Sequence, residues 1–376
     1  MRNKNDMVGM NPKNRLASLD ALRGFDMFWI MGGEELIGAL AVAFGFPEFH
    51  KTFGHVPWDG LHFMDTVFPT FLFMAGVSFP FSLSNSLAKG LTRRQVAFKS
   101  LRRGLTLMVL GIVYWGFLQR LDFDTFRIPS VLGYIGFGWM VASWIYLLVR
   151  NAYARVAIAL GILGAVTVFF GFVHAPGIPD VAVRFSPEWH LGCWLDRTIL
   201  GRHSLTPLFD NEGFGGLIPT VATALLGMFA GDVVRHGGLD ATTRKAQMLA
   251  FSGIVSALLG FALSLFYPIV KNLWSPSFVL VVGGYSFLMF AMFYWLIDVR
   301  GCSGWSFFFQ VIGVNSITIY LAQPIVGFDG VSRFFLGGVS TLSGPSVGPV
   351  IHWIGYISAC WLFLFYLYRK KTFLKI

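Results

Sequence analysis

The stretch MDTVFPTFLFMAGVSFPFSL at residues 64–83 decides the fold, because it is a long apolar run whose one ionisable residue, Asp65, lies at its start. The hydrocarbon core of a bilayer needs about 20 such residues in a helix. Further runs of this kind occur at 24–46, 104–118, 131–149, 156–173, 217–234, 247–267, 278–297, 305–326 and 347–368. The pattern predicts an all-α polytopic membrane bundle of about ten (ten or eleven) transmembrane helices.

Composition agrees with a membrane protein. Of the 376 residues, 55% are hydrophobic and only 13% are charged, against about 25% charged in a soluble domain. The net charge is +10. Basic residues lie in short loops, without the basic stripe and interleaved aromatic residues of a nucleic-acid surface. We therefore expect the lipid bilayer, and no nucleic acid, as a partner.

The basic residues also set the orientation. With the N-terminus in the cytoplasm, all but eight of the 29 Lys and Arg residues fall in inner segments, and the outer eight are Lys51, Arg120, Arg127, Arg184, Arg197, Arg202, Lys271 and Arg333. This split follows the positive-inside rule and predicts that both termini are cytoplasmic. Residues 1–14 read as a cytoplasmic tail and 15–376 as one transmembrane domain, with a long extracytoplasmic loop at about 174–216.

The first predicted span contains ionisable side chains. Each costs about 2.5–3.5 kcal/mol at the centre of a membrane helix. Asp26 lies one helical turn after Arg23, so we expect the two to form an ion pair. Glu34 lies near the middle of the span beside Glu35. Because a carboxylate at that depth is costly, the sequence favours a functional role for Glu34.

A second polar group precedes the second span. The segment FGHVPWDGLHFMDTVFPTF at 53–71 contains His55, Trp58, Asp59, His62 and Asp65. A histidine exchanges protons near neutral pH. Asp59 or Asp65 would hold one ring nitrogen, so that the other is presented as a base. The alternative is an ordinary interfacial histidine with its hydrogen bonds satisfied.

Other polar residues lie in apolar surroundings. Asn315, Tyr320 and Gln323 fall within the span 305–326, where helix–helix hydrogen bonds are the alternative explanation. Residues 271–275, KNLWS, form an outer turn. Walker A, HExxH, CxxC and GxSxG patterns are absent from the sequence. We therefore expect neither a metal site nor a serine-hydrolase elbow.

Several blocks of the chain resemble the heparan-α-glucosaminide N-acetyltransferase family. They are RLASLDALRGFDMF at 15–28, HVPWDGLHFMDTVFPTFLFMAG at 55–76, CWLDRTILGRH at 193–203, EGFGGLIPT at 212–220, VKNLWSPSFVL at 270–280, IGVNSITIYL at 312–321 and YRKKTFLKI at 368–376. The resemblance runs from about Arg15 to the last residue.

This resemblance implies a transmembrane acetyltransferase, which moves an acetyl group from cytoplasmic acetyl-CoA to a glucosamine-type amine outside. It implies a homodimer, and a bacterial inner-membrane homologue without the luminal N-terminal region. The family's catalytic histidine falls on His55. The chain departs from the family at Glu34, where relatives carry Asn, at Gly133-Tyr134, where they carry Gln-Arg, and at Gln323, where a relative carries His.

The candidate residues fall into three groups, for catalysis, for substrate binding and for binding of the CoA phosphates. We expect His55 to be the general base or a transient acetyl carrier, with Asp59 or Asp65 orienting it. Glu34 would be a protonated hydrogen-bond donor, a base or an amine anchor. The substrate-binding candidates are Trp58, Asn272, Trp274, Asn315, Tyr320 and Gln323. The candidates for the CoA phosphates are Arg93, Lys99, Arg102 and Arg103, which topology explains equally well.

Two other functions fit the same features. Buried carboxylates with an outward cavity also suit a proton-coupled sugar or solute transporter. An O-acyltransferase acting on a polysaccharide or lipid-linked sugar would use the same donor.

Overall fold

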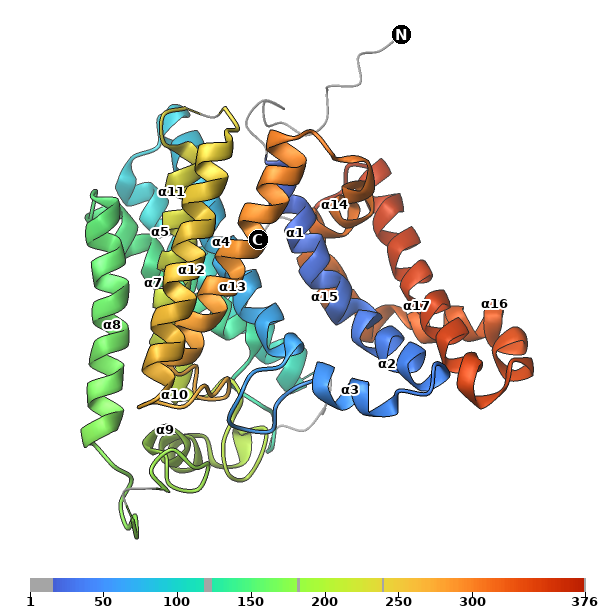
Figure 1. Cartoon of the computed structure of the whole chain (residues 1–376), viewed down its shortest axis with the longest axis horizontal. Coiled ribbons are helices and arrows are strands. Elements are labelled where there is room, and N and C mark those ends of the chain that lie inside the picture. Colours follow the sequence, from blue (N-terminus) through green and yellow to red (C-terminus); the bar gives the residue numbers. More distant parts are fainter. Residues whose placement is uncertain (1–15, 118–123, 181–182, 239, 375–376) are drawn as a thin grey trace.

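All regular elements are helices in the computed structural model, which describes residues 16–117, 124–180, 183–238 and 240–374 (Figure 1). The predicted tail 1–14 lies outside this part. The elements are α1 (Ala17–Phe28), the π-helical turn η2 (Trp29–Gly33), α2 (Glu34–Ala43), α3 (Pro47–Phe53), α4 (Phe63–Ala88), α5 (Arg93–Ile112), the π-helical turn η3 (Val113–Phe117), α7 (Val131–Leu148), α8 (Ala152–Phe172), α9 (Leu191–Leu195), η5 (Asp196–Leu200), η6 (Gly201–His203), α10 (Phe214–Leu217), α11 (Pro219–Arg235), α12 (Thr243–Ser264), α13 (Pro276–Phe293), η7 (Tyr294–Val299), η8 (Gly304–Ser306), α14 (Phe307–Gly313), α15 (Ser316–Val326), α16 (Phe328–Leu342) and α17 (Gly344–Arg369).

The helices confirm a polytopic helical membrane protein. Within the described residues, seven helical segments are long and apolar enough to cross a bilayer: Phe63–Ala88, Val131–Leu148, Ala152–Phe172, Phe214–Arg235, Thr243–Ser264, Pro276–Val299 and Gly344–Arg369. The number becomes eight if α14 and α15, bent by 64°, count as one broken span. The predicted spans at 24–46 and 104–118 do not meet this criterion.

The region predicted as the first span, 24–46, is a broken helix. The break lies in η2, where Met31 leaves helical geometry and Gly32 takes φ = 110°. A side chain is strained at this φ. A Cβ on Gly32 would also lie 3.3 Å from side chains of α17, including Trp353 and Tyr356. The break therefore places Glu34 at the start of a separate helix, α2.

The other differences have simple causes. Within the region 104–118, residues 104–112 are the second half of α5, residues 113–117 form η3, and residue 118 lies outside the described part. Helix α5 begins at Arg93 and carries five Lys and Arg residues in its first eleven positions. The segment between the last two predicted spans forms α16, which was not expected. Its 15 residues extend about 22 Å, too short to cross a membrane.

Close glycine contacts hold the centre of the bundle together. A Cβ on Gly227 of α11 would lie 2.0 Å from the backbone oxygen of Phe73, and one on Gly76 of α4 would lie 2.3 Å from that of Ala224. Small residues let membrane helices approach in this way. By contrast, only 17% of the apolar window of α8 is buried, which suits a helix that faces lipid.

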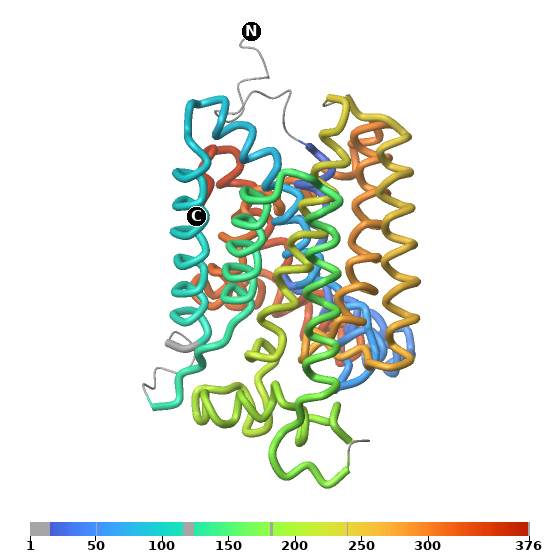
Figure 2. Tube along the Cα trace, turned by 90° about the vertical axis from the view of Figure 1, so that its left-hand side faces the viewer, coloured from blue at the N-terminus to red at the C-terminus, as the bar shows by residue number. Residues whose placement is uncertain are grey.

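The connections gather at two ends of the bundle. The segment before α4, the loop carrying α9 and α10, and the connection between α12 and α13 all lie at the lower end in Figure 1. Figure 2 shows the same end below, with the start of α1 at the opposite end. Segments far apart in sequence therefore meet at the lower end.

Candidate active site

His55 lies at the lower end of the bundle, in the segment that joins α3 to α4. Its Nδ1 is 2.8 Å from Oδ1 of Asp65. The Asp65 side chain is fully buried, whereas that of His55 is 52% exposed. Asp65 thus fixes one edge of an imidazole whose remaining surface is open to a substrate.

Local helix chemistry places Asp65. It is the third residue of α4, after the N-cap His62. Its Oδ2 accepts the backbone N–H groups of His62, at 3.0 Å, and Val56, at 3.2 Å. A carboxylate is stabilised at this position by the free N–H groups and dipole of a helix start. The same side chain therefore caps α4 and holds the loop that carries His55.

Lys271 completes the group, and sequence reasoning missed it. Its Nζ is 2.9 Å from Nδ1 of His55 and 3.4 Å from Oδ1 of Asp65. The residue was noted only as part of an outer turn. His55 and Lys271 are 216 residues apart in sequence, so spacing gave no signal. The family-like block at 270–280 was the available indication.

Backbone pairing brings the lysine to this place. Gly60 N–H donates to the oxygen of Ile269 at 2.9 Å, and Asp59 forms an antiparallel bridge with Val270. The Asn272 amide donates to the oxygen of Pro57 at 3.4 Å. The α12–α13 connection is therefore tied directly to the His55 segment.

Trp274 anchors that connection in the core. It is 1% exposed and has φ = 48°. Its indole N–H donates to Thr223 of α11 at 3.1 Å, and its ring packs on Phe68 and Tyr134. Trp274 thus holds the turn in place from within the core.

Trp58 ties the His55 segment to the long outer loop. Its indole N–H donates to the oxygen of Phe185 at 2.8 Å. Its ring lies edge-on to Phe209, with 5.0 Å between centroids. Asp59 itself is exposed, so Asp65 is the carboxylate that contacts the His55 ring.

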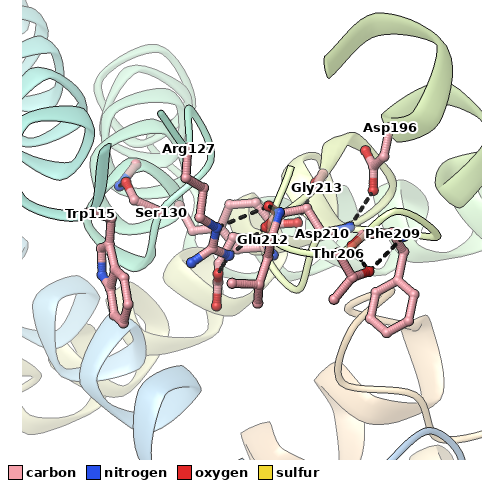
Figure 3. A network of polar contacts seen from close by, with 12 residues as sticks. Trp115, Arg127, Ser130, Asp196, Thr206, Phe209, Asp210, Glu212 and Gly213 are labelled. Atoms are coloured by element: carbon pink, nitrogen blue, oxygen red, sulfur yellow. Dashed lines mark hydrogen bonds and ion pairs between the residues drawn. The ribbon is translucent and has the colours of Figure 1, made fainter. Parts of the chain in front are cut away.

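A buried ionic network lies in the same loop region (Figure 3). Arg127 donates to both oxygens of Asp210, at 2.9 and 2.5 Å, and also to Glu212. The three side chains are at most 8% exposed. Burial raises the pKa of Glu212, against the opposing charges of Arg127 and Lys271. The network and the His55 group therefore interact electrostatically through Lys271.

A cavity of about 140 Å³ adjoins this network. Its lining is mostly apolar and includes Met108, Ile128, Leu200, Tyr134 and Glu212. Asp196 stabilises the neighbouring backbone by accepting the N–H groups of Phe214, at 2.8 Å, and Asp210, at 3.3 Å. Burial raises the pKa of Asp196 to about 6.

The remaining substrate candidates lie deeper in the bundle. Asn315 is 2% exposed at the α14–α15 break, and its Nδ2 has no hydrogen-bond partner among the described residues. The Tyr320 hydroxyl accepts the indole N–H of Trp115 at 2.9 Å. Gln323 accepts from Tyr356 at 3.3 Å. No polar contact joins these residues to His55 in the described part of the chain.

Glu34 and Asp26 also lie apart from His55. Glu34 is half-buried at the start of α2, and among the described residues no polar contact links it to His55, Asp65 or Lys271. The expected Arg23–Asp26 pair is wrong. Arg23 lies 3.8 Å from Asp20 and also binds Ser78, whereas Oδ2 of Asp26 is buried without a partner among the described residues.

The basic candidates on α5 lie at the other end of the bundle. The 26 residues of α4 extend about 39 Å between His55 and the start of α5. Arg93 donates to the oxygen of Leu147 at 2.8 Å, and Arg103 lies over the Trp139 ring at 4.5 Å. Lys99 and Arg102 are exposed. No cluster of three or more His, Cys, Asp or Glu residues suited to a metal occurs in the described part.

Two known proteins are similar to the chain over nearly its whole length. No protein-family model matches the chain. The mouse heparan-alpha-glucosaminide N-acetyltransferase is 26% identical over 421 aligned positions, covering 97% of this chain and 62% of the relative. The human protein of the same name is 26% identical, covering 96% and 60%. The chain thus spans about three fifths of the length of these curated relatives. The chain is therefore similar over nearly its whole length to two heparan-alpha-glucosaminide N-acetyltransferases, and this similarity supports membership of their family.

Proposed function

We propose that the chain is a transmembrane acetyltransferase. It transfers an acetyl group from cytoplasmic acetyl-CoA to the amine of a glucosamine-type sugar on the extracytoplasmic side. The observation that carries this proposal is the half-exposed His55, held by the buried Asp65 at the family's catalytic position. The names of the mouse and human relatives support the reaction class.

His55 acts as the general base. With its Nδ1–H donated to Asp65, its Nε2 is free to take a proton from the attacking amine. The amine nitrogen bonds to the thioester carbonyl carbon, the C–S bond breaks, and the proton passes from Nε2 to the departing CoA sulfur. In a two-step variant, His55 carries the acetyl group between donor and acceptor.

The acyl donor is assigned to the two helix breaks and the basic end of α5. Asn315, whose buried Nδ2 has no hydrogen-bond partner among the described residues, is assigned to the path of the pantetheine arm at one break. Glu34 follows the other break. Arg93, Lys99, Arg102 and Arg103 offer cations to the CoA phosphates.

The proposed topology has ten membrane passes and both termini in the cytoplasm. Broken helices count as passes here, which adds α1–η2–α2 and α5–η3 to the eight described above. We further propose a homodimer in a bacterial inner membrane. Single cysteines introduced near Arg202 and Arg244 would test sidedness, because a membrane-impermeant thiol reagent should label the first and spare the second in intact cells. The opposite labelling pattern contradicts the topology.

Acetyl transfer by the purified protein tests the function. Proteoliposomes receive labelled acetyl-CoA and a panel of amino sugars and neutral glycans, and products are identified by mass spectrometry. We expect an N-acetylated amino sugar, abolished in His55→Ala. His236→Ala is the matched control, because His236 is exposed at the end of α11 opposite His55.

Other outcomes contradict the proposal. Solute uptake without acetyl-CoA would favour a transporter, and products acetylated on oxygen would favour an O-acyltransferase. Substantial turnover by a folded His55→Ala protein would remove His55 from the mechanism.

A further inference from the structure

We propose that Lys271 is a positioning residue, whose ammonium opposes a second charge on the His55 ring and so keeps His55 neutral before the reaction. This inference rests on the proposed function of His55 as a base. Neither the composition nor the spacing of the sequence assigns Lys271 a role.

The three polar atoms form a closed triangle. Nδ1 of His55 lies 2.8 Å from Asp65 Oδ1 and 2.9 Å from Lys271 Nζ, and the last two atoms are 3.4 Å apart. A neutral imidazole carries a single ring proton, on Nδ1 or on Nε2. With the proton on Nδ1, the N–H donates to Asp65 and Nε2 can act as a base. With the proton on Nε2, Nδ1 accepts from the Lys271 ammonium and Nε2 cannot take a proton from the substrate.

Charge decides the protonation state of the ring. A buried carboxylate alone would stabilise the imidazolium and occupy the base with a proton before substrate arrives. An ammonium in contact with the same ring opposes that charge. The proton taken from the amine is then released readily to the CoA sulfur.

Several ionisable groups surround His55. Asp65 faces it from α4 and Lys271 from the α12–α13 connection. Glu212, from the outer loop, interacts with Lys271. Asp59 and His62 lie on the His55 segment, and α3 carries the exposed Glu48–Lys51 pair. Of these groups, Asp65 and Lys271 are the two in contact with the ring.

The backbone around Lys271 is fixed by hydrogen bonds, and its side chain is largely buried. Trp274 N–H donates to the oxygen of Lys271 at 2.8 Å, and the N–H of Val270 donates to Ser275 Oγ at 3.0 Å. The Lys271 side chain is 15% exposed. A buried turn that presents one ammonium to one imidazole is the geometry expected of a positioning role.

The test compares Lys271→Met with Lys271→Arg and Lys51→Met. Lys51 is a matched control, because its side chain is 74% exposed on α3 and pairs with Glu48. In Lys271→Met, we expect the acidic limb of the kcat/KM profile to move up by about one pH unit, the effect of removing one screened charge at this separation. Lys271→Arg should restore most of the shift, and Lys51→Met should leave the profile unchanged.

A second measurement needs no activity. The imidazole of His55 is titrated by NMR on protein labelled at histidine Cε1, and its signal is assigned by its loss in His55→Ala. The pKa of His55 should be higher in Lys271→Met by a similar amount. An unchanged pKa overturns the inference, even if turnover falls. Absence of acetyl transfer in wild type overturns the proposed function instead, so the two failures are distinguishable.

Discussion

Arg127→Met tests the buried network beside the candidate site. Arg127 neutralises Asp210 and Glu212, and all three side chains are at most 8% exposed. Removing one partner of a buried ion pair costs about 3–5 kcal/mol, because the remaining charge stays desolvated. Methionine preserves much of the packing volume. We therefore expect the free energy of unfolding to fall by about 3–5 kcal/mol at pH 8.

The matched control is Arg333→Met. Arg333 pairs with Asp329 at 2.9 Å on α16, but its side chain is 71% exposed. Exposed pairs contribute about 0–1 kcal/mol, so this substitution should be nearly neutral. Both variants are compared by denaturant-induced unfolding in mixed micelles, followed by tryptophan fluorescence.

The dependence on pH provides a second check. Without Arg127, the charge that opposes the effect of burial is lost, and the folded-state pKa of Glu212 rises further above its unfolded value. The folded state then binds more protons, so the stability of the variant falls as pH increases through that pKa. The deficit relative to wild type should shrink between pH 8 and pH 5. A loss no larger than that of Arg333→Met, or one independent of pH, would refute the reasoning.

Three further predictions follow from the packing and the site. Gly227→Ala should lose about 1–3 kcal/mol, because its Cβ would meet the Phe73 backbone, whereas Gly161→Ala, with open space around it, should not lose stability in the same unfolding assay. Asp65→Asn should lower kcat by about 10²–10⁴-fold with a folded protein, since an amide favours the wrong His55 tautomer; a loss below tenfold would argue against the pair. The pKa of Asp196 is raised to about 6, so its ionisation destabilises the folded state as pH rises from about 4 through 6. The free energy of unfolding of Asp196→Asn should therefore increase relative to that of wild type by about 3 kcal/mol between pH 4 and pH 8. A constant difference in this free energy across that range would contradict the prediction.

Much of the helical architecture could be predicted from apolar run length alone. The run at 64–83 became α4, and 131–149 became α7, because a helix satisfies its own backbone inside a membrane. Helix breaks were harder to foresee. Gly32 lies in an apolar run like many other glycines, and its φ of 110° depends on the packing of α17 against it.

The candidate site was predicted where its residues are close in sequence. His55 and Asp65 lie within one segment, and the structure places them 2.8 Å apart. The contribution of Lys271 depends on two loops meeting at one end of the bundle, which local patterns do not specify. The same holds for Arg127 and Asp210, whose pairing spans 83 residues.

The 216-residue separation of His55 and Lys271 also bears on biogenesis. A ribosome that has released only the first helices into the membrane has delivered the imidazole and its carboxylate, but not the ammonium that accompanies them. The three groups meet only after the hairpin of α12 and α13 has been inserted and docked. This centre therefore cannot assemble before the connection between α12 and α13 has been synthesised.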